Sequence, residues 1–150
     1  VLLMGAGGAA YGVLQPLLHK QPDRLVIANR NLEKANLLHQ LYANLSSTKI
    51  SACTYDDLRH ETPFDLVINA TSVGLSDSEI PLPPTIFAPN ALAYDMMYGR
   101  ETPFMAFARQ HGAQVADGLG MLVEQAAEAF YIWRGVRPET ASVIAALRNQ

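Results

Sequence analysis

The 150-residue sequence lacks features that several classes of protein require. It has one cysteine, Cys53, so no internal disulfide can form, and no Cys/His cluster has the spacing of a metal site. No apolar run reaches the roughly 18 residues that a membrane-spanning helix needs, and we find no secretion signal. Eleven basic against fourteen acidic residues give a formal charge of −3, without the basic excess typical of nucleic-acid or membrane-surface binding. These absences predict a cytoplasmic protein with no metal, nucleic-acid or membrane partner.

The residues that are present indicate a globular domain of ordinary size. With 49% hydrophobic residues, a chain of 150 can bury the core of one domain. Val1 already lies in an apolar run, and no initiator methionine precedes it. We therefore expect the chain to be a piece of a longer protein.

Apolar runs typical of strands alternate with helical patterns along most of the sequence. A threonine, a proline and a final glycine delimit a predicted helix over 102–112. Residues 72–90 are rich in Gly, Ser and Pro and predict an extended loop with at most one helical turn. The predicted strands are 1–4, 24–30, 49–53, 64–70, 91–97 and 113–117.

The alternation stops near Gly118, and two successive helices are predicted after it, over 119–133 and 138–147. Strands separated by helices form a parallel sheet with right-handed crossovers. The predicted fold class is therefore α/β, a doubly wound, Rossmann-like parallel sheet with two C-terminal helices. Ligands of such sheets bind beyond the carboxyl ends of the strands, where four loops of this chain should meet.

The glycine-rich loop after the first predicted strand has the pattern of a dinucleotide site. Gly5, Gly7 and Ala10 match G-x-G-x-x-A between a strand and a helix. The first glycine of this pattern makes a tight turn, the second lets a pyrophosphate approach the helix N-terminus, and the third small residue packs the helix. We expect a dinucleotide here, with a purely structural turn as the alternative.

The end of the second predicted strand favours one dinucleotide over another. NAD-binding folds usually have an acidic residue there, which bonds the ribose 2′-hydroxyl. This sequence has Asn29, Arg30 and Asn31 instead, with Lys34 one helical turn later. Arginine can bond a 2′-phosphate through several N–H groups and stack on adenine. These residues favour NADP, with a solvated arginine at a strand end as the alternative.

Polar residues after the other strands are less specific. Thr71 and Ser72, in NATSVG, could form a turn in any loop. Tyr94, Asp95 and Tyr98 lie at a predicted carboxyl edge, where a phenol can donate to a substrate hydroxyl or carboxylate. A buried Tyr–Asp pair that satisfies itself is the alternative. Gln125 lies among small and apolar residues of a predicted helix and suits a polyhydroxylated ligand. The four histidines lie away from these strand ends and are assigned no role.

Five motifs together resemble the shikimate dehydrogenase family, in that family's order and spacing, over essentially the whole chain. The resemblance implies reversible, NADPH-dependent reduction of 3-dehydroshikimate to shikimate, on the route to chorismate and the aromatic amino acids. It also implies that residues 1–118 form the NADP-binding domain and that residues 119–150 return to an N-terminal substrate domain. The motifs are GAGGAA, NRNLEK, NATSVG, YDMMY and ADGLGMLVEQAA.

The resemblance further implies roles for residues at matching positions of these motifs. Met96 and Gly118 would meet the nicotinamide amide through backbone groups. Tyr98 and Gln125 would contact the shikimate or 3-dehydroshikimate substrate. The remaining assignments are Gly5, Ala6, Gly7, Gly8 and Ala9 to the pyrophosphate, Thr71 and Ser72 to the cofactor ribose, and Asn29, Arg30, Asn31 and Lys34 to the adenosine 2′-phosphate.

The sequence also departs from the family pattern. Ala10-Tyr11 stands where the family often has Ser-Arg, which removes a cation near the phosphates, and Asn31 stands where threonine is frequent. The lysine and aspartate that transfer protons in the family belong to the N-terminal domain, so the resemblance places no catalytic residue in this chain. We expect the fragment to bind NADP(H) and to turn over little or no shikimate.

Two other functions remain open at this point. A quinate/shikimate dehydrogenase relative would prefer NAD, which Arg30 and Lys34 disfavour. A noncatalytic NADP-binding module would have no use for Tyr98 and Gln125. The C-terminal helices should expose apolar residues, including the AFYIW stretch, so a homodimer of this chain would form through a surface left bare by truncation.

Overall fold

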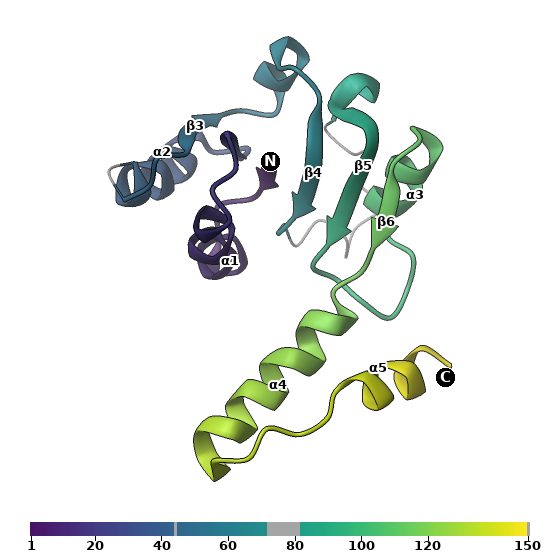
Figure 1. The fold of residues 1–150 in the computed structure, drawn as a ribbon. Coiled ribbons are helices and arrows are strands. Elements are labelled where there is room, and N and C mark those ends of the chain that lie inside the picture. The colour runs from purple at the N-terminus through teal and green to yellow at the C-terminus, as the bar shows by residue number, and fades with distance from the viewer. Residues whose placement is uncertain (44, 72–81, 150) are drawn as a thin grey trace.

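All strands of the described chain lie in one parallel sheet with the order β3-β2-β1-β4-β5-β6. The computed structural model describes residues 1–43, 45–71 and 82–149 (Figure 1). The order runs outward in both directions from β1 and β4, so the predicted doubly wound α/β fold is confirmed. The strands are β1 (Leu2–Met4), β2 (Arg24–Ala28), β3 (Lys49–Cys53), β4 (Phe64–Asn69), β5 (Phe87–Asp95) and β6 (Gln114–Ala116).

Helices and short 3₁₀ turns connect these strands. The helix α3 lies within the predicted range 102–112, and both predicted end signals are found. Thr102 accepts a bond from the Met105 N–H at its start, and Gly112 adopts φ +81° after its end. The helices are α1 (Gly8–His19), α2 (Leu32–Tyr42), α3 (Pro103–Gln110), α4 (Leu119–Arg134) and α5 (Ala141–Arg148), and the 3₁₀ turns are η1 (Asp56–His60) and η3 (Pro84–Ile86).

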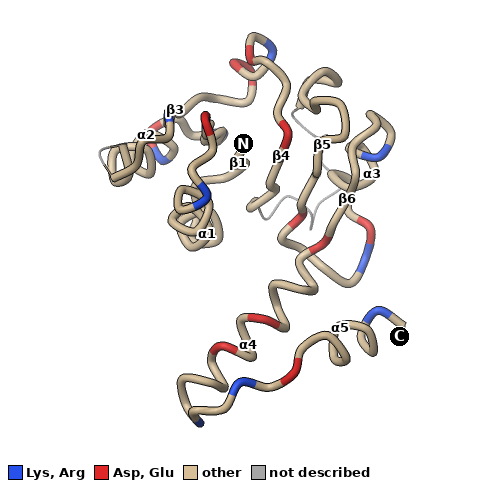
Figure 2. Tube along the Cα trace, in the orientation of Figure 1, with Lys and Arg blue, Asp and Glu red and all other residues tan. Residues whose placement is uncertain are grey.

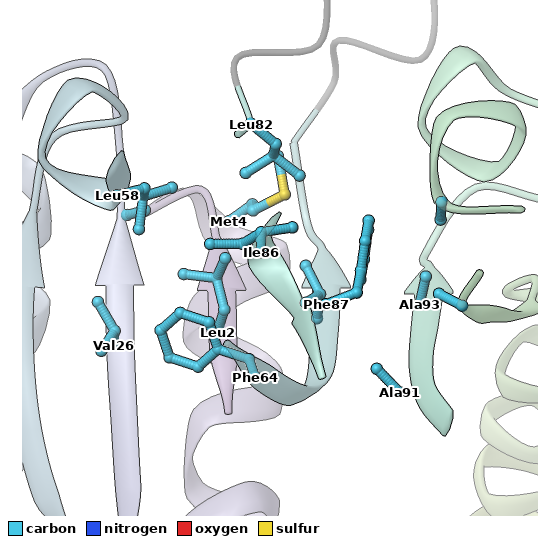
Figure 3. Packing of buried hydrophobic residues seen from close by; sticks show 14 of the residues in the cluster. Leu2, Met4, Val26, Leu58, Phe64, Leu82, Ile86, Phe87, Ala91 and Ala93 are labelled. Carbon is cyan, nitrogen blue, oxygen red and sulfur yellow. The ribbon is translucent and has the colours of Figure 1, made fainter. Parts of the chain in front are cut away.

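The sheet separates two hydrophobic layers. Because successive side chains of a strand point to opposite faces, Leu2 and Met4 enter one layer and Leu3 the other. The first layer, part of which appears in Figure 3, includes Phe104 of α3 and Leu58 of η1. The second layer is formed with buried residues of α1 and α2. Both faces of the central strands are therefore covered, which explains their continuous apolar sequence.

The C-terminal helices lie away from both layers. In Figure 1, α4 leaves the sheet near the end of β6 and α5 runs back beside it. Their contacts include bonds from Thr140 Oγ1 to Glu124 (2.7 Å) and from Arg148 to Asp117 (3.0 Å). None of the described residues of α5 is buried. Within the described ranges, no helix has both the length and the hydropathy to cross a membrane.

Several predicted boundaries differ from the observed ones, since β2 ends at Ala28 rather than at residue 30 and α5 begins at Ala141 rather than at residue 138. The largest difference is at β5. The fifth strand was predicted over 91–97, but β5 covers Phe87–Asp95 and takes the last residues of the predicted 72–90 loop. Pro89 and Asn90 suggested a loop, yet they form an irregularity within the strand: Asn90 has φ +63° and the pairing with β4 shifts register between Phe64 and Leu66. Proline and left-handed residues are tolerated in a strand at such bulges. Residues 72–81 of that loop lie outside the described chain.

Candidate functional site

The loops that follow β1, β2, β4 and β5 meet along the carboxyl edge of the sheet. Backbone hydrogen bonds continue past the strand ends and join each loop to its neighbour, so the four motifs share one rim. These bonds run from Asn29 N to Cys53 O (3.1 Å), Gly5 N to Ala28 O (2.8 Å), Ala70 N to Met4 O (2.9 Å) and Met96 N to Asn69 O (3.0 Å).

Gly5 is required by the protein's own backbone. Its φ is +101°, a conformation that side-chain-bearing residues rarely adopt. A Cβ atom there would also lie 3.0 Å from the Ala70 carbonyl oxygen and 3.2 Å from Cγ2 of Thr71. The first glycine of the motif therefore makes the turn from β1 to α1 and lets it lie against the end of β4.

Gly7 and Gly8 are not explained by packing. No described atom lies within 4 Å of a Cβ built on either residue, and both are exposed, as is Ala9. Gly7 is the N-cap of α1 and supplies no side-chain cap, and residues 8–11 include no acid. The first N–H groups of a helix carry partial positive charge and lack intrahelical acceptors. This end of α1 thus fits an anionic group such as a pyrophosphate, whereas Ala10 is buried against the sheet.

The end of β2 carries a short polar turn rather than an acidic residue. The side-chain amide of Asn29 donates to the Asn31 carbonyl oxygen (2.8 Å), and Asn31 Oδ1 caps α2 by accepting from the Lys34 N–H (3.2 Å). Arg30 and Lys34 are exposed on this turn. The side chain of Asn31 has therefore a structural role as a helix cap, and the two cations remain accessible to a solvent-borne anion.

Tyr55, in the loop after β3, lies near this basic turn. Burial raises the pKa of the Tyr55 phenol to about 12, and the Arg30 guanidinium opposes that shift. The ring stays protonated at neutral pH and packs against the first hydrophobic layer. The neighbouring Cys53 thiol also has a raised pKa, about 11, mainly because of burial. Neither group is a nucleophile at neutral pH.

Tyr11 stands at the position where the family that the sequence resembles often has an arginine. Its ring packs edge-on against Tyr42 at the end of α2, with 6.1 Å between the ring centroids. The side chain thus contributes to the packing of α1 against α2. It supplies no positive charge to the helix N-terminus.

Asn69 and Asp95 form a buried polar network between the ends of β4 and β5. Asn69 Oδ1 accepts from the backbone N–H (3.1 Å) and hydroxyl (2.6 Å) of Thr71, and its amide donates to Asp95 (3.2 Å). Asp95 is wholly buried and also accepts from the Thr102 hydroxyl and the Met97 N–H. The network fixes the Thr71 loop to the turn after β5.

The pairing of Tyr94 with Asp95 is not found. Adjacent strand residues point to opposite faces, so Asp95 turns toward Asn69 and Thr102 while Tyr94 joins the layer formed with α1 and α2. Burial and, to a lesser extent, Asp117 raise the pKa of the Tyr94 phenol. Sequence reasoning missed Asn69 and Thr102 as the partners of Asp95. The alternation of side chains along a strand could have shown that Tyr94 and Asp95 point to opposite faces.

Met96 and Gly118 are brought into direct contact. A Cβ on Gly118 would lie 2.2 Å from the Met96 carbonyl oxygen, so only glycine fits there. The Gly118 N–H donates to the Met97 carbonyl (2.9 Å) and the Met96 N–H to Asn69. Both N–H groups are engaged within the protein, and the Gly118 carbonyl accepts from the Leu122 N–H (3.0 Å). Among the described hydrogen bonds, the Met96 carbonyl oxygen is therefore the group of this pair that is most available to a ligand.

The two predicted substrate residues, Tyr98 and Gln125, form none of the described hydrogen bonds with the residues of the rim. Tyr98 follows β5 and is about half exposed, and Gln125 is exposed on α4. Ser72 lies outside the described residues, so its predicted position beside Thr71 is not tested. Figure 2 shows acidic and basic residues scattered over the elements, without a basic stripe on the described chain.

The chain matches one protein family and one domain of known type, in separate segments. The shikimate/quinate 5-dehydrogenase family matches residues 1–76, and the shikimate 5′-dehydrogenase C-terminal domain matches residues 118–148. A curated relative from Methylobacillus flagellatus, named shikimate dehydrogenase (NADP(+)), is 60% identical over 149 residues. The match covers 99% of this chain and 54% of the relative, so the chain spans about half the length of the curated relatives it matches.

Solved structures agree with the fold. An Ael1 enzyme from Pseudomonas putida is 48% identical, with a TM-score of 0.88 over 97% of this chain and 53% of that one. Shikimate 5-dehydrogenase from Thermus thermophilus, solved with NADP(H) and shikimate, is 32% identical, with a TM-score of 0.80 over 99% of this chain and 54% of that one. Both resemblances extend over the sheet and the C-terminal helices.

Proposed function

Because the chain belongs to the shikimate/quinate 5-dehydrogenase family, we propose that it is the C-terminal, NADP(H)-binding half of a shikimate dehydrogenase. The whole enzyme would reduce 3-dehydroshikimate to shikimate reversibly with NADPH. Residues 1–118 would bind the cofactor, and residues 119–150 would pack against an N-terminal substrate domain. We place the enzyme in the reducing cytoplasm, because this part of it has a single cysteine, Cys53, and so forms no internal disulfide.

The observation that carries the cofactor assignment is the open N-terminus of α1 beside an end of β2 that lacks an acidic residue. Gly7 and Gly8 leave space over helix N–H groups, which suits a pyrophosphate, and the protein's own packing gives no reason for these glycines. Arg30 and Lys34 are exposed on the adjacent turn. Two cations beside a pyrophosphate site would bind a 2′-phosphate, which distinguishes NADP from NAD.

Each part of the rim would hold one part of the cofactor. NADPH, when bound, supplies the hydride. Residues 5–9 would bind the pyrophosphate, Thr71 and Ser72 would line the ribose, and Asn29 would shape the turn that presents Arg30. The Met96 carbonyl oxygen would accept from the carboxamide and so orient the nicotinamide ring. The Gly118 carbonyl already accepts from the Leu122 N–H (3.0 Å), so it would contact the carboxamide through its second lone pair.

The substrate would be contacted from the outer side of this rim. Tyr98 can donate from its phenol, and Gln125 can both donate and accept, which suits a hydroxylated acid. We place no proton-transferring residue in this chain, so these roles would belong to the N-terminal half. The isolated chain should therefore bind NADP(H) and turn over little or no shikimate. A homodimer of the isolated chain would form through the apolar residues of α4.

Parallel calorimetric titrations with NADP⁺ and NAD⁺ test the cofactor assignment. We expect NADP⁺ to bind at least about tenfold more tightly, a difference near 1.4 kcal/mol. Arg30→Ala combined with Lys34→Ala should remove that preference, because NAD⁺ lacks the phosphate that the cations bind. Lys20→Ala is the matched control, since Lys20 is an exposed cation at the opposite end of α1.

The other outcomes have definite meanings. Equal affinity for the two dinucleotides in the unmodified protein would favour the NAD-using quinate/shikimate relative. Preferential NADP⁺ binding by a full-length protein that shows no turnover of shikimate would indicate a noncatalytic binding module. Failure of both dinucleotides to bind the full-length protein would overturn the proposed function.

A further inference from the structure

Asp95 is a wholly buried charged side chain for which the proposed function gives no role. Its carboxylate accepts hydrogen bonds from three neutral groups: the Met97 N–H (3.0 Å), the Asn69 side-chain amide (3.2 Å) and the Thr102 hydroxyl. A buried carboxylate is costly unless such donors compensate for the lost water. Its three donors come from three separate segments of the chain, which places Asp95 at the centre of the rim.

The bonds of Asp95 act on the backbone of residues 96 and 97. Oδ1 holds the Met97 N–H directly, and Oδ2 holds Asn69, whose own carbonyl accepts from the Met96 N–H (3.0 Å). The Met97 carbonyl in turn accepts from the Gly118 N–H (2.9 Å). The orientation of the Met96 carbonyl is therefore set by Asp95 on one side and by the start of α4 on the other.

Thr102 extends this arrangement to a third element. Its hydroxyl donates to Asp95 and accepts from the Met105 N–H (3.2 Å), so the same oxygen caps α3 and fixes the carboxylate. Thr102 is itself buried, and α3 packs into the first hydrophobic layer through Phe104. The carboxylate is thus anchored to the core and cannot follow movements of the exposed turn at residues 98–101.

We propose that Asp95 is a positioning residue for the nicotinamide end of the cofactor. This proposal rests on the function proposed above. Its carboxylate fixes the Met96–Met97 backbone so that the Met96 carbonyl oxygen is directed at the carboxamide. Through Asn69 it also ties this backbone to Thr71, on the ribose side. Asp95 touches neither cofactor nor substrate and acts only through these neighbours.

Asp95→Asn in the full-length enzyme tests this role. The variant keeps the shape of the side chain but places an NH₂ group where an oxygen accepted from an N–H, so the residue 96–97 backbone loses a fixed position. We expect kcat to fall at least about tenfold and the fluorescence emission of bound NADPH, which reports the nicotinamide environment, to change. The dissociation constant of adenosine 2′,5′-bisphosphate should stay the same, because this probe has no nicotinamide.

Two further variants separate positioning from folding. Asp57→Asn is the control, because Asp57 also accepts from a backbone N–H and a hydroxyl, those of Thr54, in the loop after β3. It should leave all three measurements unchanged. Thr102→Val removes one donor to Asp95 and should change the same measurements in the same direction, while Thr102→Ser restores them. If Asp95→Asn does not fold, the Thr102 pair decides the question.

The proposal is overturned if folded Asp95→Asn keeps the wild-type kcat and NADPH emission, or if kcat falls only in proportion to the folded fraction in a thermal melt. A reduced affinity for adenosine 2′,5′-bisphosphate would also overturn it, since the effect would then extend over the whole site. Failure of the unmodified enzyme to bind either NADPH or this probe is a different result. It would refute the proposed function and the role of Asp95 with it.

Discussion

Gly118 lies against the carbonyl group of Met96 so closely that a Cβ atom on Gly118 would be 2.2 Å from the oxygen. The Gly118 N–H also donates to the next carbonyl, that of Met97, at 2.9 Å. The start of the C-terminal helix α4 is therefore placed by the turn after β5. This contact links the rim at the carboxyl edge of the sheet to the helix that carries Gln125.

Gly118→Ala should destabilise the fold by about 1 to 3 kcal/mol, because the obstructing atoms belong to the backbone and cannot rotate away. Gly120→Ala is the matched control two residues later. No described atom lies within 4 Å of its Cβ position, and alanine favours the helix over glycine, so this variant should gain about 0.5 to 1 kcal/mol. Urea unfolding curves measure both changes. Shifts of the two midpoints in the same direction would contradict the contact.

Substitutions should separate the two functions of the glycine loop, which are the tight turn at Gly5 and the space for a pyrophosphate at Gly7. Gly5→Ala places a side chain at φ +101° and 3.0 Å from the Ala70 carbonyl, and should cost about 1 to 3 kcal/mol of stability. Gly7→Ala meets no described atom and should cost less than about 1 kcal/mol. It should nevertheless weaken NADP⁺ binding at least about tenfold, measured by calorimetry, because its methyl group occupies the space of the pyrophosphate. Normal binding by folded Gly7→Ala would argue against a pyrophosphate at this helix end.

The fold could be predicted because its central strands are buried on both faces. Residues 25–28 of β2 and Leu2–Met4 of β1 are continuous buried apolar runs between polar turns. Their alternation with helical patterns predicts the element order and the parallel topology. The start of β5 could not be predicted in this way. Its pairing with Phe64 depends on a bulge at Asn90, and Pro89 and Asn90 have the same sequence signal in a bulge as in a loop.

The candidate site likewise has parts that the local sequence predicts and parts that it does not. The glycine loop and the basic turn are local, so their sequence alone indicates a dinucleotide with a 2′-phosphate. The bonds joining Asn69, Asp95 and Thr102 arise between separate segments, and no spacing rule specifies them. The contact of Gly118 with Met96 also depends on the path of the chain between β5 and α4.

Stability should fall in alkaline solution because acidic groups that are buried or partly buried, Cys53 and Tyr55 foremost, keep their protons in the folded state. Burial raises the pKa of Cys53 from 9.0 to about 11 and that of Tyr55 from 10.0 to about 12. The unfolded chain releases these protons first, so the stabilisation is complete below about pH 9 and is lost as the pH rises toward 12. Urea midpoints across this range measure the loss.

Tyr55→Phe should flatten the upper part of that pH profile, since phenylalanine has no proton to release. Tyr98→Phe is the control, because the Tyr98 ring is about half exposed. An equally steep alkaline loss in Tyr55→Phe would show that burial of the Tyr55 phenol does not contribute.

Trp133 can report whether the C-terminal helices pack against another domain. It is the one tryptophan of the sequence and is 77% exposed on α4, close to the exposed residues Phe130, Ile132 and Val136. Apolar surface of this kind is typical of an interface. If residues 119–150 return to an N-terminal domain, Trp133 of the full-length protein should emit at shorter wavelength and resist acrylamide quenching, whereas Trp133 of the isolated chain should be fully quenched.

Self-association of the isolated chain would also shield Trp133, and dilution distinguishes the two cases. A blue shift that disappears on dilution reports contact between copies, because that contact depends on concentration. A shift that persists at the lowest concentration, and only in the full-length protein, reports packing within one chain. Equal quenching of Trp133 in the full-length protein and in the dilute isolated chain would mean that this face of α4 stays open to solvent, and that the interface with the N-terminal domain lies elsewhere.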